Sequence, residues 1–181
     1  MSAAPEPEFS RLIDIRKIDG KELDLQATAP ECAALAARFS LVSIGSLVAR
    51  VRLARDGEVV QVAGRLLADI VQSCAISGED LPVRINEPLV LRFISEKAAA
   101  ALDEELELSA DACDEIPFAG DHFDLGEAAA QSLALAIDPF ATGPNAEQVR
   151  QKAGLLDEGA AGPFAALAAL KGLAKKGSPE S

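Results

Sequence analysis

The side chains best suited to chemistry in this chain lie close together, in Asp121, His122 and Asp124. His122 is the single histidine of the chain, so only one imidazole is present to activate a serine or cysteine nucleophile. The two carboxylates could hold a divalent cation or act as acid and base, but their spacing fits no calcium-binding loop. We therefore predict no catalytic residue and no enzymatic activity, and keep a metal-dependent enzyme that uses these three residues as an alternative.

The cysteines offer little support for a metal site. Cys32, Cys74 and Cys113 lie about forty residues apart and form no Cys-x-x-Cys pair. A zinc site takes its ligands at clustered spacings, which these cysteines and one histidine do not provide. The glycines form neither a Walker loop nor a dinucleotide-binding fingerprint. We predict no metal and no cofactor, and expect the cysteines to be small buried residues or inert thiols.

The negative charge of the chain indicates which class of partner it can bind. The net charge is −12, and residues 96–127 hold eleven acidic residues against one lysine. Because nucleic-acid binding depends on lysine and arginine neutralising phosphates, direct contact with RNA is possible but is not favoured by this charge. An acidic segment favours a basic protein as partner. The alternative is that this charge belongs to a solvated loop that keeps the protein soluble.

Composition also bears on ligands and location. Aromatic residues make up 4% of the chain, with no Trp or Tyr, so an aromatic cage for a small-molecule substrate is not expected. The N-terminal sequence MSAAPEPEFS is acidic and lacks the apolar core of a signal peptide. No apolar run reaches the length of a membrane span. We expect a soluble, cytoplasmic protein with no membrane partner.

Alternating patterns predict a sheet in the middle of the chain. Residues 9–19 and 22–27 are expected to form a strand pair, and residues 28–38 a short helix with Thr28 as its N-cap. Residues 41–54 and 59–71 predict a long β-hairpin whose turn contains Asp56 and Gly57. A further strand is expected at 82–94, where Pro88 indicates an edge position or a bulge.

The remaining segments are predicted to be helices and a linker. Residues 127–137 have apolar side chains at helical spacing and stop at Asp138-Pro139. Residues 141–162 are typical of a flexible linker, and residues 163–181 of a basic amphipathic helix or tail. The expected fold class is α+β: a domain over residues 1–140 with an antiparallel sheet, a barrel-like closure being one option, two flanking helices, and a short C-terminal helix on the linker.

Three segments, with an acidic stretch between the first and the second, give the chain a family resemblance. They are the strand and turn at residues 60–81, HFDLGEAAAQSLALAIDPF from His122, and PFAALAALK from Pro163. In this order they resemble the large ribosomal RNA subunit accumulation protein family, the YceD-like proteins of bacteria and plastids. Gly64 and Cys74 fall in the family motif. Ser77 stands where relatives have a second cysteine, so a zinc or redox role is not carried over.

The resemblance implies a non-enzymatic factor that supports 23S rRNA accumulation and large-subunit assembly. We expect it to contact a basic ribosomal or ribosome-assembly protein, through an acidic face and through the apolar side of the C-terminal helix. The alternatives are a C-terminal helix that packs on its own sheet, and a protein-interaction module without a ribosomal role. The expected partner-binding residues are Asp121, Asp124, Leu125, Glu127, Pro163, Phe164, Leu167, Leu170 and Lys171.

Overall fold

The computed structural model describes residues 7–18, 20–96, 98 and 115–153. The chain divides into two compact units. The first groups residues 1–73 with 80–139, and the second groups residues 74–79 with 140–181. Residues 74–79 therefore belong to the second unit, although the strands directly before and after them in the sequence belong to the first. Sequence patterns did not indicate this grouping. Each unit is described by itself below.

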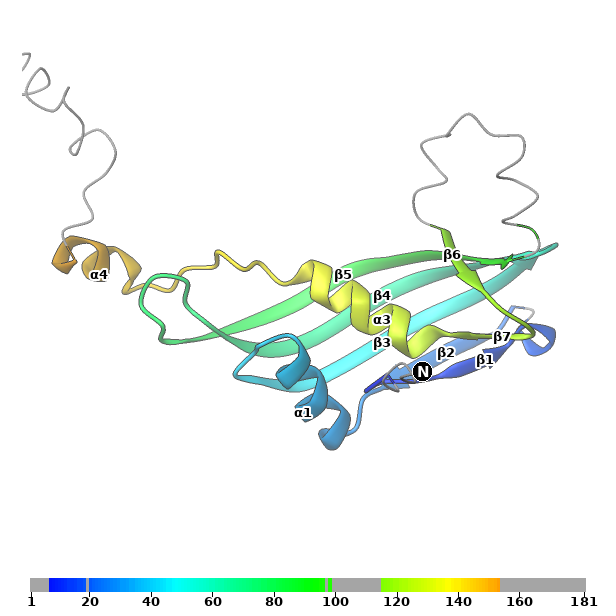
Figure 1. Ribbon diagram of the computed structural model, residues 1–181, viewed down its shortest axis with the longest axis horizontal. Helices are drawn as coiled ribbons and strands as arrows, with labels where there is room; N and C mark the ends of the chain where they lie inside the picture. Colours follow the sequence, from blue (N-terminus) through cyan, green and yellow to red (C-terminus); the bar gives the residue numbers. More distant parts are fainter. Residues whose placement is uncertain (1–6, 19, 97, 99–114, 154–181) are drawn as a thin grey trace, which may run out of the picture. The chain divides into compact units, whose positions relative to one another are not determined.

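A five-stranded sheet forms the first unit (Figure 1). Its order is β2-β3-β4-β5-β6, with antiparallel pairing from β2 to β5 and parallel pairing between β5 and β6. The strands are β2 (Glu22–Gln26), β3 (Ser43–Asp56), β4 (Val59–Ser73), β5 (Asp80–Ser95) and β6 (Glu115–Phe118). The α+β class is confirmed. In the described residues β2 and β6 end the sheet without pairing to each other, so it is open and not a closed barrel.

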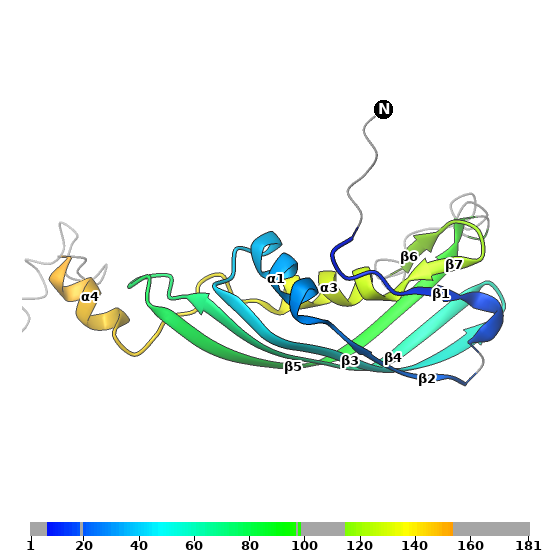
Figure 2. The ribbon, with the colours of Figure 1, turned by 90° about the horizontal axis from the view of Figure 1, so that it is seen from below.

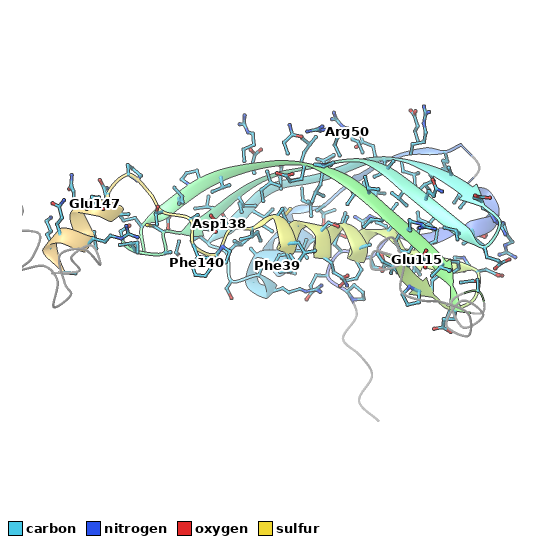
Figure 3. The ribbon with its side chains drawn as sticks, turned by 90° about the horizontal axis from the view of Figure 1, so that it is seen from above. Phe39, Arg50, Glu115, Asp138, Phe140 and Glu147 are labelled. Atoms are coloured by element: carbon cyan, nitrogen blue, oxygen red, sulfur yellow. The ribbon has the colours of Figure 1, made fainter. Side chains whose placement is uncertain are left out.

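The hairpin predicted from Asp56 and Gly57 is confirmed. Asp56 pairs with Val59, and Gly57 between them has a φ of +60°, a conformation that costs glycine little. On β3 the alternate residues from Leu47 to Leu53 are buried, while Arg50 and Arg52 are exposed on the opposite face. Arg50 points away from the helices in Figure 3. One face of the sheet therefore builds the core and the other meets solvent.

The predicted pairing of residues 9–19 with 22–27 is wrong. Strand β1 (Leu12–Asp14) pairs antiparallel with β7 (His122–Asp124), and β2 pairs with β3. After β1 the chain enters a 3-10 turn, η1 (Ile15–Lys17), and the carboxylate of Asp14 accepts a hydrogen bond from the backbone N–H of Arg16. This capped turn replaces the tight reversal that a hairpin would need, so β1 and β2 have different neighbours.

Two helices lie on the same face of the sheet, toward which the long strands curve (Figure 2). They are α1 (Ala29–Arg38) and α3 (Leu125–Ala136), and both match predicted helices. Thr28 and Glu31 form the capping box expected at the start of α1. Leu35 of α1 and Leu133 of α3 are fully buried. The two helices thus close one side of the core.

Strand β5 is an edge strand along most of its length. In the described residues β6 is in register only with Arg92–Ser95, so the stretch from Asp80 to Leu91 has β4 as its single neighbour. Pro88 lies in this stretch, opposite Arg65 of β4. The edge position predicted from this proline is confirmed, because proline has no N–H to donate to a second neighbour.

The second unit is described at residues 74–79 and 140–153. Its helix α4 (Ala146–Lys152) lies inside the segment that the sequence led us to expect as a linker without regular structure. Residues 74–79 and 140–143 are joined by a backbone hydrogen bond from the N–H of Ala75 to the carbonyl of Ala141, at 3.0 Å. The predicted C-terminal helix at 163–181 lies outside the described residues.

Among the described residues, no helix combines the length and the apolar character that crossing a membrane requires.

Candidate partner-binding site

Asp124 joins three segments of the first unit. It caps α3, since its Oδ1 accepts the backbone N–H of Glu127 at 3.0 Å. The same carboxylate accepts the N–H of Arg11 at 2.8 Å and the hydroxyl of Ser10 at 2.6 Å. Asp124 was predicted to bind a partner. Its contacts give it a structural role, and any role in partner binding stays a prediction.

The next two residues of this motif pack tightly. Leu125 is fully buried, so its side chain presents no surface to a partner in this structure. A Cβ on Gly126 would collide with the carbonyl oxygen of Phe9 and lie 2.8 Å from the backbone nitrogen of Arg11. The Asp-Leu-Gly sequence therefore starts α3 directly against the chain that enters β1.

Glu127 connects α3 to α1. Its carboxylate receives two hydrogen bonds from the Arg38 guanidinium, at 2.7 and 2.9 Å, and one from the Gln131 side-chain amide at 3.0 Å. The hydrogen bonds from Arg38 are the main reason that the pKa of Glu127 lies below its ordinary value. Arg38 also binds Glu8 at 2.8 Å. Glu127 is thus engaged within its own unit.

Asp121 is the most accessible of the predicted acidic residues. Its side chain is 57% exposed, and its Oδ2 lies 3.5 Å from the Arg16 guanidinium. His122 lies on β7 opposite Asp14 of β1. In the ranges that the structure describes, no three His, Cys, Asp or Glu side chains are grouped as a metal site requires. Asp121 is therefore the predicted acidic residue best placed for a partner.

Gly64, which the sequence singled out on the resemblance alone, lies where β4 approaches the backbone of β3 very closely. A Cβ at this position would overlap the carbonyl oxygen of Arg50 and lie 2.7 Å from the Cα of Val51. No other residue fits without a shift of the β3 backbone. This glycine is a structural requirement of the sheet.

Cys74, the second residue that the sequence singled out, belongs to the second unit. Cys74 is 3% exposed, so it is buried, as expected. The sulfur accepts the backbone N–H of Gly143 at 3.2 Å and that of Ser77 at 3.4 Å. These hydrogen bonds, led by the one from Gly143, lower the pKa of Cys74 to about 6. Cys74 is the cysteine that the sequence singled out, and the expectation that its thiol is inert stays a prediction.

Ser77, three residues after Cys74, has hydrogen-bonding partners of its own. Its hydroxyl lies 3.2 Å from Oε2 of Glu79, and accepts the Glu79 N–H at 3.4 Å. Asn145 donates to the same Glu79 carboxylate at 3.1 Å. Hydrogen bonds of Ser77 and Asn145 to Glu79 thus organise this loop.

The predicted partner-binding residues of the C-terminal segment lie outside the described residues. They are Pro163, Phe164, Leu167, Leu170 and Lys171. The structure therefore brings together only the group around the start of α3.

A surface that sequence patterns missed lies along the edge of β5. Leu135 of α3 is 90% exposed and Val90 of β5 is 70% exposed, and both line the same groove. The available signal was the position of Leu135, two residues after the buried Leu133 and so away from the buried side of the helix.

Comparison with protein-family models, with curated proteins and with solved structures finds no match to this chain.

Proposed function

We propose that this protein is a non-enzymatic factor that supports 23S rRNA accumulation and assembly of the large ribosomal subunit. It acts in the cytoplasm by contacting a basic ribosomal or ribosome-assembly protein. The observation that carries the proposal is the ordered set of segments that resembles the YceD-like family. Within that set, Gly64 allows β4 to approach the β3 backbone, and Asp124 caps the start of α3.

Charge supports a basic protein as the partner. The chain carries a net charge of −12, concentrated in residues 96–127. Asp121 offers an exposed carboxylate in this region, whereas Asp124 and Glu127 are tied into the start of α3. Complementary charge speeds encounter and selects partners more than it adds affinity. Binding through this region should therefore weaken as salt is raised.

Sedimentation of a cell extract tests the proposal. The tagged protein is run on sucrose gradients at low and moderate salt, and the proteins and RNA of each fraction are identified. Comigration with precursors of the large subunit is expected, with less comigration at the higher salt. A protein that stays at the top of the gradient at both salts would contradict the proposal and leave an interaction module without a ribosomal role.

A further inference from the structure

We draw no further inference here: the strongest candidate, the exposed arginines Arg50 and Arg65 that lie directly opposite each other on the solvent-facing side of the sheet, carries none, because Asp24 lies beside Arg50 and nothing in the described residues shows what covers this surface.

Discussion

Arg38 in the last turn of α1 and Glu127 in the first turn of α3 form a bidentate ion pair, with Nη1 2.9 Å from Oε2 and Nη2 2.7 Å from Oε1. Their side chains are 32% and 20% exposed, so the pair is partly shielded from solvent. It joins two helices that are far apart in sequence and lie on the same face of the sheet (Figure 2).

Glu127→Gln should lower the free energy of unfolding by about 1 kcal/mol, because a bidentate charge-assisted pair is lost. Urea denaturation measures this change. Glu22→Gln is a matched control, since Glu22 pairs with Arg52 where both side chains are about 70% exposed. The control should cost less than about 0.5 kcal/mol. Equal costs would mean that shielding adds nothing to the α1–α3 pair.

Because of Glu31, the free energy of unfolding should depend on pH in the acid range. Glu31 pairs with Arg11 and accepts the Thr28 backbone N–H, and its pKa is lowered from the ordinary 4.5 to about 2, chiefly by the hydrogen bond from Arg11. A carboxylate with a depressed pKa in the folded protein stabilises it above the unfolded pKa, and this stabilisation is lost as pH falls from about 4.5 toward 2. Glu31→Gln should flatten the dependence of the unfolding free energy on pH in this window. Urea denaturation at each pH measures it. An unchanged slope would contradict the assignment.

Gly64→Ala should destabilise the protein by about 3 kcal/mol or more, because the added Cβ overlaps the backbone of β3 and no side-chain motion can relieve it. Gly45→Ala provides the control within β3, since its Cβ would meet only the carbonyl oxygen and Cβ of Asp69, at 3.6 and 4.0 Å. Thermal unfolding followed by circular dichroism compares the two. Similar melting temperatures would mean that β3 can shift to accept a side chain at position 64.

Substitutions at Asp124 and Asp121 should have different effects, the first on stability and the second on partner binding. Asp124→Ala removes an N-cap and two further hydrogen bonds, so it should cost about 2 kcal/mol. Asp121→Asn should leave stability within about 0.5 kcal/mol, because its pair with Arg16 is exposed. Denaturation measures both. Asp121→Asn should also reduce comigration with large-subunit precursors at low salt, and undiminished comigration would exclude Asp121 from the contact.

The Cys74 thiol should titrate near pH 6, because backbone N–H groups stabilise its thiolate. Thiolate absorbance in the ultraviolet, recorded in a variant with Cys32→Ser and Cys113→Ser, gives the midpoint. Ser77→Ala in the same background should raise it, since the Ser77 side chain also lowers the pKa of Cys74. A midpoint in the usual thiol range in both proteins would contradict this prediction.

Features specified by neighbouring residues were predictable. The capping box of Thr28 and Glu31 marks the start of α1, and Gly57 marks the turn of the β3–β4 hairpin. Pro88 marks the edge of the sheet, because its missing N–H excludes a second neighbouring strand at that point. In each case the physical cause acts within a few residues and is therefore visible in the order of the amino acids.

Long-range packing decided the rest. An alternating pattern at Leu12–Asp14 shows that a strand forms, but its partner, His122–Asp124, is selected by the hydrogen bonds of Asp124 across the fold. The close approach that requires Gly64 arises only when β3 and β4 pair. The groove at Leu135 exists because α3 lies beside the edge of β5. The sequence by itself determined the class of fold, its main local elements and its acidic character, because these follow from short-range chemistry. Strand partners and the exposed groove needed the tertiary structure, because they depend on which distant segments meet.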